Sequence, residues 1–264
     1  MTIYTDLFRY RELFANLFRR DLRAKYKGSV LGLAWTLAHP LLLMGIYVVV
    51  FSLLWRAFDI DHYALFLLSG LVAWLFFATS LQNASRSMLD NANLIKKVRF
   101  PRQLVPLSVV ATQLVTFAVM LVALIAVNAV FIPRTRDTVW LSLPLALAVV
   151  ALVCGIALAV ASINVVFRDV EHLIAALLLP WFFLTPVLYP LDKLPGADRH
   201  PTIVNLVHYG NPITPAVQAI RDPLFFGRTP RAADVIYLCV AAVAALALGA
   251  FVFNRVDDQI AVEL

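Results

Sequence analysis

Apolar residues in this chain are concentrated in six long stretches that contain no Asp, Glu, Lys or Arg. These stretches are 20 to 29 residues long and cover 31–55, 63–85, 105–133, 139–167, 172–191 and 235–254. A helix needs about 20 mainly apolar residues to cross the hydrocarbon core of a bilayer. The pattern therefore predicts an all-α integral membrane protein, with six transmembrane helices in a single domain that covers 1–264.

The first 30 residues differ from these stretches because they alternate apolar and basic positions. Leu7, Tyr10, Phe14, Leu17 and Phe18 recur at helical spacing and share one face of a helix. Basic amphipathic helices of this kind lie along the surface of the inner leaflet. We therefore expect an N-terminal interface helix, and a short solvated arm is the alternative.

The fifth stretch and the segment after it, 192–234, have their own patterns. Pro180, Pro186 and Pro190 interrupt the stretch, and proline removes a backbone donor, so this helix should be bent or broken. The long segment 192–234 carries apolar residues at helical spacing, namely Ile213, Val217, Ile220 and Leu224. It is expected to form short re-entrant helices in the outer interface, and a folded external cap is the alternative.

Composition and charge support a membrane protein and give its orientation. The chain is 62% hydrophobic and 14% charged, with a mean hydropathy of +0.84, far from an ordinary soluble domain. With the N-terminus inside, 14 of the 22 basic residues lie in cytoplasmic segments, 3 in the two short outer loops and 5 in 192–234. The positive-inside rule then places both termini in the cytoplasm. This accounts for the net charge of +6 without a nucleic-acid partner.

The sequence contains no evident source of energy for transport. The six stretches lack acids, Lys and Arg, and His39 is the main titratable exception, with His172 at the edge of the fifth stretch, which disfavours ion-coupled transport. No Gly-Lys dipeptide occurs, so a phosphate-binding loop is excluded. If ATP drives the protein, a separate ATPase must dock on a cytoplasmic segment. The segment 91–102 suits that role because it combines basic and apolar groups; the alternative is a positively charged anchor at the interface.

Several motifs, in order along nearly the whole chain, resemble those of one known family. They are Arg23-Ala24-Lys25-Tyr26-Lys27-Gly28-Ser29, Leu94–Arg102 with Pro106-Leu107, Phe167-Arg168-Asp169-Val170, Thr185–Pro190, and Asn211-Pro212 with Arg221-Asp222. The family is that of the permeases of polysaccharide and polyol-phosphate exporters, which are ATP-binding-cassette transporters of the type-2 permease superfamily.

The resemblance implies a transport permease rather than an enzyme, without a cofactor of its own. It implies a homodimer in the bacterial plasma membrane, paired with two copies of a cassette ATPase that bind ATP and Mg. The cargo it implies is a lipid-linked glycan of the O-antigen, capsule, teichoic acid or cell-wall galactan class. A drug, lipid or small-metabolite exporter of the same superfamily is the alternative.

Two groups of site residues follow from the resemblance. The expected ATPase-coupling residues are Asn93, Leu94, Ile95, Lys96, Lys97, Arg99, Phe100, Pro101 and Arg102. The residues expected to attract the anionic head group of the lipid carrier are Arg19, Arg20, Arg23, Lys25 and Lys27. Attraction of membrane phospholipid explains the second group equally well.

Aromatic residues are candidates for the path of a sugar chain, because they offer apolar faces to sugar rings and, in Tyr and Trp, a polar tip. The candidates on the first and fifth stretches are Tyr47, Phe51, Trp55, Trp181, Phe182, Phe183 and Tyr189. Aromatic residues also gather at membrane interfaces without such a role.

A membrane enzyme acting at the outer face is a further alternative. The candidates for its chemistry are Asp192, Asp198, His200, His208 and Asp222. Their spacing matches no recognised metal or acid–base pattern.

Overall fold

The computed structural model describes residues 9–28, 32, 34–54, 60–191 and 201–263, and side chains within these ranges except at 52–54 and 258–263. Every regular element in these ranges is a helix, which confirms the all-α class. Five of the helices are long and apolar enough to cross a membrane: Ala34–Phe51, Tyr63–Asp90, Leu104–Phe131, Val139–Val166 and Ala232–Asp257. The chain is therefore an all-α integral membrane protein.

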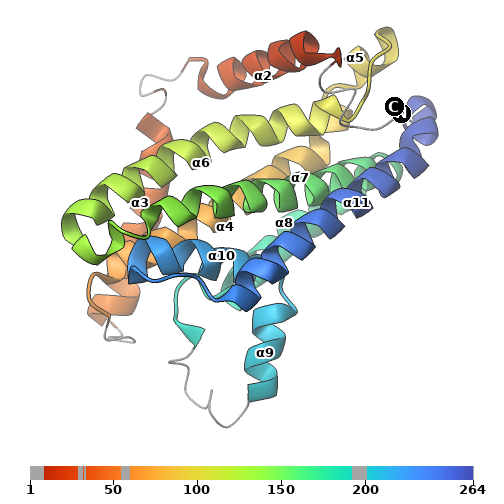
Figure 1. Cartoon of the computed structure of the whole chain (residues 1–264). Coiled ribbons are helices and arrows are strands. Elements are labelled where there is room, and N and C mark those ends of the chain that lie inside the picture. The colour runs from red at the N-terminus through yellow and green to blue at the C-terminus, as the bar shows by residue number, and fades with distance from the viewer. Residues whose placement is uncertain (1–8, 29–31, 33, 55–59, 192–200, 264) are drawn as a thin grey trace.

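The elements follow one another as a bundle of long helices with shorter helices at both ends (Figure 1). The long elements are α3 (Ala34–Val48), which continues as a π-helical turn (Val49–Leu54), α4 (Tyr63–Asp90), α6 (Leu104–Phe131), α7 (Ser142–Val166), α8 (Asp169–Leu184) and α11 (Ala232–Glu263). The shorter elements are α2 (Arg11–Tyr26), α5 (Ala92–Lys97), α9 (Pro201–Tyr209), α10 (Ile213–Arg221), a π-helical turn (Asp222–Phe226) and two 3-10 turns (Pro133–Thr135, Val139–Leu141).

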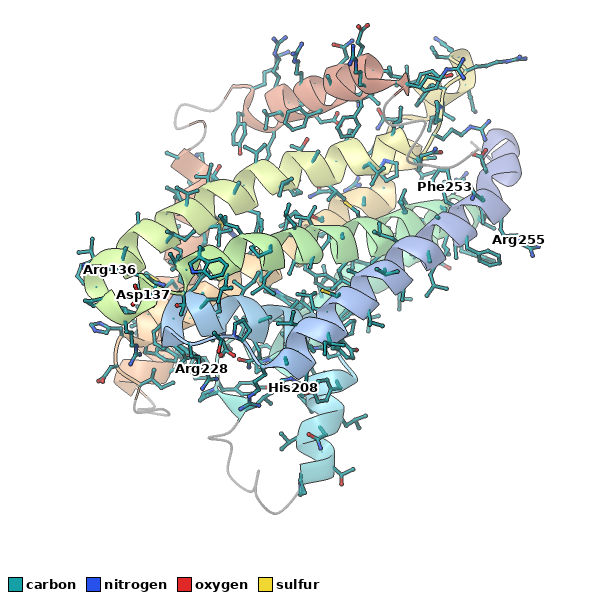
Figure 2. All side chains as sticks on the ribbon, viewed as in Figure 1. Arg136, Asp137, His208, Arg228, Phe253 and Arg255 are labelled. Atoms are coloured by element: carbon teal, nitrogen blue, oxygen red, sulfur yellow. The ribbon has the colours of Figure 1, made fainter. Side chains whose placement is uncertain are left out.

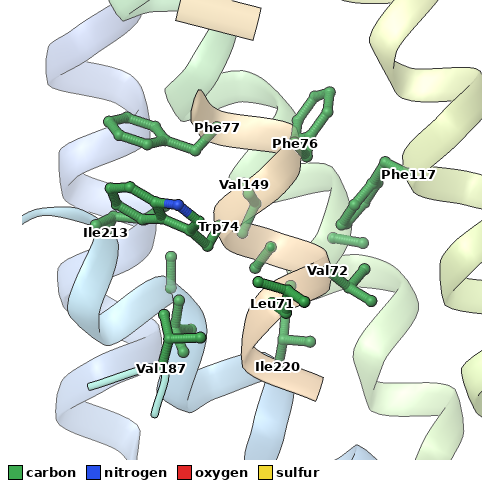
Figure 3. Packing of buried hydrophobic residues seen from close by; sticks show 14 of the residues in the cluster. Leu71, Val72, Trp74, Phe76, Phe77, Phe117, Val149, Val187, Ile213 and Ile220 are labelled. Carbon is green, nitrogen blue, oxygen red and sulfur yellow. The ribbon is translucent and has the colours of Figure 1, made fainter. Parts of the chain in front are cut away.

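Helix α4 is the centre of the bundle. In its most apolar window 72% of the residues are buried, against 11% for α3 and 17% for α11. Its side chains pack in several directions at once: Phe76 stacks on Phe117 of α6 with ring centroids 4.7 Å apart, and Trp74 lies 5.5 Å from Phe182 of α8. Figure 3 shows Trp74, Phe76 and Phe117 beside Val149, Ile213 and Ile220. The outer helices keep apolar residues exposed, as expected for faces that contact lipid.

The fifth apolar stretch forms a helix shorter than the other five, when the π-helical continuation of α3 is counted with α3. Helix α8 has 16 residues and ends at Leu184, because Thr185 precedes Pro186 and a residue before proline avoids the helical conformation. Its length of about 24 Å falls short of the hydrocarbon core, which is about 30 Å thick. The count of six spans therefore stays a prediction.

The N-terminal helix α2 is amphipathic, as its sequence pattern indicates, and it packs lengthwise on α6. Leu17 on its apolar face is buried, and Ser108 of α6 donates a hydrogen bond to Asp21 at 3.0 Å. Further along, Lys25 reaches Gln113 of the same helix, so the two helices run side by side in one direction. Part of the apolar face of α2 is thus used for protein packing, and its contact with lipid stays a prediction.

The two ends of the bundle are built differently. Helix α5 and the C-terminal end of α11 lie at one end, and α9 and α10 lie at the other (Figure 1). With the termini inside, as the basic residues predict, α5 faces the cytoplasm and α9 and α10 face outward.

Candidate functional site

A large cavity lies between α2, α3, α4 and α6, toward the end of the bundle that carries α5. Its volume is about 830 Å³, within the range of pockets that hold small-molecule ligands. Val72, Leu75 and Phe76 of α4 form an apolar part of the wall, and Thr79 and Asn83, one and two turns further along the same helix, are polar. The cavity can therefore receive a group with both a polar and an apolar part.

The charged residues of this cavity come mainly from α2 and from the end of α4. Arg20, Lys25 and Arg86 contribute positive charge, and Asp21 and Asp90 contribute negative charge. Arg20 is paired with Asp21 at 2.7 Å, whereas Arg86 lies 3.9 Å from Asp90. Arg86 also lies 3.4 Å from Glu171 of α8, so its guanidinium is shared between two carboxylates and would interact with a bound anion in competition with them.

Lys25 is the basic residue of α2 that is fixed most firmly in the cavity wall. Its Nζ donates hydrogen bonds to Gln113 Oε1 at 2.8 Å and to Thr116 Oγ1 at 2.7 Å. Burial by neighbouring protein atoms lowers the pKa of the Lys25 ammonium, and Tyr26 opposes this effect. A bound anion would restore the favourable environment that the ammonium has lost.

The five basic residues predicted to attract a head group are divided by the structure. Arg20 and Lys25 line the cavity, whereas Arg19, Arg23 and Lys27 lie along a second hollow on α2, which Arg20 also borders. All five side chains are exposed. All five residues lie within nine positions of one another, so the sequence alone did not indicate which of them face the cavity.

The predicted aromatic path residues fall into packed and exposed members. Tyr47 stacks on Phe182 with ring centroids 5.7 Å apart and lies 6.4 Å from Phe51. Trp181 packs edge-on against Phe77 of α4 and donates its Nε1–H to Asn211 Oδ1 at 2.8 Å. These four candidates and Phe77 therefore join α3, α4, α8 and the turn before α10.

One of the described aromatic candidates is exposed: Phe183 is 50% exposed. Tyr189 is half-buried, like Tyr47 and Trp181, and its hydroxyl donates a hydrogen bond to the Phe183 backbone carbonyl at 2.9 Å. By contrast, the neighbouring Phe182 is only 5% exposed. Trp55 lies outside the described residues.

The predicted ATPase-coupling residues lie in α5 and in the turn that leads to α6. Ile95 is buried in a second hydrophobic cluster together with Met88, Val105, Val165 and Phe253, and Phe100 packs against this cluster. The side chains of Asn93, Lys96, Lys97 and Arg99 are exposed, Leu94 and Pro101 are half-buried, and Arg102 bonds to Asp257 of α11 at 2.9 Å. The segment thus combines a fixed apolar side with an exposed basic side.

A buried arginine at the opposite end of the bundle was not among the predicted site residues. Arg221 of α10 is fully buried and donates hydrogen bonds to the carbonyls of Pro186 and Val187 at 2.7 and 2.8 Å, and to Ser69 Oγ at 3.3 Å. These two carbonyls are free because α8 has already ended. Burial lowers the pKa of Arg221, while Asp222 and Tyr63 oppose the shift. The sequence did contain a signal for this burial. Arg221 continues the four-residue spacing of Ile213 and Val217, which places it on the same apolar face of the helix.

The residues considered for outer-face enzyme chemistry are engaged in structural pairs where they are described. His208 Nε2 lies 2.6 Å from Asp234 Oδ1, and Arg228 lies 2.8 Å from Asp222. Burial raises the pKa of Asp222, and Arg228 opposes this shift. Asp192, Asp198 and His200 lie outside the described residues. Within the described ranges, no group of three His, Cys, Asp or Glu side chains is placed to hold a metal ion.

Comparison with known proteins places these features in context. The model of the family described as ABC-2 type transporter matches residues 12–225. The chain is 31% identical to the O-antigen export system permease protein RfbA of Myxococcus xanthus, over 97% of this chain and 96% of that protein. It is 30% identical to the RfbA permease of Klebsiella pneumoniae, over 95% and 94% of the two chains. It is 22% identical to the polysialic acid transport protein KpsM of Escherichia coli, over 92% of each.

Proposed function

Since this chain belongs to the ABC-2 type transporter family, we propose that it is the membrane subunit of an ATP-driven exporter of lipid-linked polysaccharide. The observation that carries the proposal is the similarity to O-antigen export permeases, which extends over more than nine-tenths of both chains. The all-α membrane fold and the cavity between α2 and the bundle are consistent with this role.

In the proposed mechanism, the cavity between α2, α3, α4 and α6 receives the head group of the lipid carrier. A phosphate or pyrophosphate group would interact with Lys25, Arg86 and Arg20, which already lie on the wall. The carrier's lipid tail would stay in the bilayer, and the apolar part of the cavity near Phe76 and Phe117 would contact apolar surface next to the head group. Charge and geometry thus favour an anionic amphiphile over a neutral solute.

The energy for export would come from a separate cassette ATPase that binds ATP and Mg. Two ATPase copies would dock on the exposed basic side of α5 in a homodimer of this chain. Because Ile95 and Phe100 pack against the cytoplasmic ends of α4, α6, α7 and α11, closure of the ATPase pair would move those ends as one unit. The chain itself would undergo no covalent chemistry.

We place the protein in the bacterial plasma membrane with both termini in the cytoplasm. The basic residues on α2 and α5 support this orientation. The long segment 192–234, with α9 and α10, would then lie at the outer surface and shield the exit of the path.

The test is depletion of the protein in its host, followed by composition analysis of lipid-linked glycans on the inner face of the plasma membrane. The proposal predicts that one lipid-linked polymer accumulates there while it disappears from the cell surface. Normal surface glycan with no accumulation would contradict the polysaccharide cargo. The leading alternative would then be export of a drug, lipid or small metabolite.

A further inference from the structure

A small polar pocket lies at the outer end of the bundle, where α9 and α10 meet the start of α11. Its volume is about 180 Å³, well below the roughly 300–1,000 Å³ of sites for drug-sized ligands. Figure 2 shows His208 and Arg228 of this pocket near the start of α11, and Arg255 at the other end of that helix. The lining residues that can carry charge at neutral pH are, among those described, His208, Arg221, Asp222, Arg228, Arg231 and Asp234. Three arginines and two aspartates give the pocket a net positive charge.

Both aspartates of the pocket are already paired. Asp222 lies 2.8 Å from Arg228, and Asp234 lies 2.6 Å from His208. Arg231 differs, because its side chain is exposed and makes neither a hydrogen bond nor an ion pair with any residue that the structure describes. The pocket thus presents one unpaired guanidinium on its open side, which can bind an anion.

Two side-chain amides add hydrogen-bond donors to the same pocket. Asn205 of α9 and Gln218 of α10 line it, and within the described ranges neither side-chain amide has a hydrogen-bond partner. The nitrogen of each amide carries two N–H donors. Together with Arg231, these amides offer unused donors from three sides of the pocket, and the oxygen atoms of a phosphate ester are suitable acceptors for them.

An apolar hollow of about 560 Å³ adjoins the polar pocket, since Tyr209 lines both spaces. Its other lining residues all come from α11 and are Ala233, Ile236, Tyr237, Val240 and Ala241. They recur every three or four residues and so form one face of the helix, about 12 Å long. Ile236 and Val240 are each 63% exposed, on a helix that is only 17% buried in its most apolar window. The hollow therefore opens toward lipid and not toward the interior of the bundle.

Two tyrosines hold the boundary between the polar pocket and the apolar hollow. The Tyr237 hydroxyl donates a hydrogen bond to the Tyr209 backbone carbonyl at 2.7 Å, and the two ring centroids lie 5.6 Å apart. The membrane-spanning part of α11 begins at Ala232, directly after Arg231. Tyrosine side chains at the end of a span are typical of the level of the lipid head groups. The polar pocket is thus placed at head-group depth, and the hollow extends from it into the hydrocarbon region.

We propose that the polar pocket and the apolar hollow together bind one anionic phospholipid of the outer leaflet. Its phosphate accepts hydrogen bonds from Arg231 and from the amides of Asn205 and Gln218, and one acyl chain lies in the hollow along α11. The net positive charge of the pocket favours an anionic head group over a zwitterionic one, whose cationic part would be repelled by Arg231. A lipid bound in this way connects α9 with α11.

A membrane phospholipid fits this site better than the lipid-linked glycan does. Neither space shares a lining residue with the cavity beside α2, which we propose to hold the head group of the glycan carrier. The polar pocket has about 180 Å³ against about 830 Å³ for that cavity, so it has room for a phosphate and its glycerol but not for sugars attached to a carrier. The proposal rests on the proposed function only for the leaflet, which follows from the orientation of the chain, and the cargo does not enter it.

The experiment identifies the lipids that stay bound to the purified permease–ATPase complex. The complex is transferred from nanodiscs of phosphatidylglycerol and phosphatidylcholine in equal amounts into detergent, and native mass spectrometry counts the retained lipids. The proposal predicts that phosphatidylglycerol is retained in preference to phosphatidylcholine. Arg231→Gln should lower this retention about tenfold or more, as expected for the loss of a charge-assisted hydrogen bond.

A second variant tests the apolar hollow. Ala233→Trp places a large ring in the space of the acyl chain and should lower retention of phosphatidylglycerol as well. Arg134→Gln is the matched control, because Arg134 is an exposed arginine that lies beside Gly227 at the same end of the bundle and lines neither space. It should leave retention unchanged. In detergent without added lipid, Arg231→Gln should melt at the same temperature as the native protein, so that its effect is one on binding and not on folding.

Equal retention of the two phospholipids would overturn the proposal. Equal losses in Arg231→Gln and Arg134→Gln would overturn it too, since they would indicate general attraction of anionic lipid to basic side chains.

Competition distinguishes the phospholipid from other phosphate compounds. Glycerol 3-phosphate has the phosphate without a chain, and a polyprenyl phosphate stands for the glycan carrier. Neither should displace phosphatidylglycerol at an equal concentration. Displacement by glycerol 3-phosphate would mean that the polar pocket acts without the hollow, displacement by the polyprenyl phosphate would assign the site to the carrier, and either result would overturn the proposal. None of these measurements involves export, so a failure of the proposed glycan cargo would leave their outcome unchanged.

Discussion

The guanidinium carbon of Arg221 lies 4.0 Å from the centroid of the Phe66 ring, in the buried interior between α4 and α10. Phe66 covers one face of the guanidinium, and the carbonyls of Pro186 and Val187 accept its hydrogen bonds. Gly70, one turn after Phe66, leaves the space for it, because a Cβ there would collide with Arg221 Nη2. One side chain therefore ties α10 to α4 and to the irregular segment after α8.

Arg221→Ala should destabilise the folded protein strongly. It leaves two carbonyls without their donor, at about 1–3 kcal/mol each, and adds a void beside Phe66. Arg221→Lys should recover only part of this loss, because an ammonium lacks the planar fork that reaches both carbonyls. Thermal unfolding in detergent measures the effect, with Arg231→Ala, an exposed arginine, as the control. Equal melting temperatures for Arg221→Ala and Arg231→Ala would contradict the assigned role.

Gly249→Val should separate α7 from α11, since the new side chain would meet the backbone of Gly155. We expect a loss of about 1–3 kcal/mol or more, as for other overpacked sites. Gly45→Ala on α3 is the matched control, because nothing lies within 4 Å of a Cβ at that position. Denaturant unfolding of both variants gives the comparison. If Gly249→Val leaves the free energy of unfolding unchanged, the backbones of α7 and α11 are further apart at this point than in the structure.

Lys25→Ala should weaken binding of a lipid-linked pyrophosphate more than Lys27→Ala does. Both side chains are exposed, but Lys25 lines the cavity and bonds to Gln113 and Thr116, whereas Lys27 lies outside the cavity. Loss of one charge-assisted hydrogen bond, worth about 1.5–3 kcal/mol, corresponds to roughly a tenfold or larger loss of affinity. Binding to the protein in nanodiscs of neutral lipid is the measurement. Equal effects of the two substitutions would instead indicate general attraction of anionic lipid to α2.

Reversing the charges of Lys96 and Lys97 together should separate the permease from its ATPase without unfolding it. Both side chains are exposed. By contrast, Ile95 of the same helix is buried in the hydrophobic cluster with Met88 and Phe253, and this contact holds α5 in place. Unfavourable charge at a docking surface costs several kcal/mol, so copurification of the ATPase should fall about tenfold or more. Arg255→Glu, on the exposed end of α11, is the control. Unchanged copurification would show that the ATPase docks elsewhere.

Phe182 and Phe183 are neighbours in the sequence and should behave differently on truncation. Phe182→Ala removes a buried ring that contacts Tyr47 and Trp74, which should cost about 3–5 kcal/mol of stability. Phe183→Ala removes a half-exposed ring, so stability should hold while export falls if this residue lines the sugar path. Unfolding and export assays on both variants test the pair. Normal export by Phe183→Ala would remove it from the path.

The helical membrane fold could be predicted from the sequence, because each long charge-free stretch must satisfy its backbone within a helix in lipid. Because all six stretches are similarly apolar, the sequence does not indicate which helix lies at the centre of the bundle. The helix of Val240, α11, is more apolar than α4, with a mean hydropathy of 2.6 against 2.1, yet Val240 is 63% exposed and Trp74 of α4 is 5% exposed. In a membrane both lipid and protein neighbours select apolar residues, so hydropathy does not distinguish them.

The candidate site was harder to predict because its geometry depends on distant contacts. Lys25 differs from Lys27 in its hydrogen bonds to Gln113 and Thr116 of α6, and these residues lie about 90 positions further along the chain. The three consecutive aromatic residues from Trp181 point in different directions, since each helical residue rotates by about 100°. Helical periodicity therefore separates Phe182 from Phe183, but only the structure shows which of them is covered.

The size of the cavity beside α2 has a consequence for the cargo under the proposed function. A space of about 830 Å³ holds a head group and the sugars next to it, but not a polymer. Selection at this cavity would therefore act on the end of the molecule that enters first and would be indifferent to the number of repeat units behind it. The distribution of chain lengths at the cell surface would then be set by the enzymes that build and terminate the polymer, and a variant permease would change how much glycan is displayed rather than how long it is.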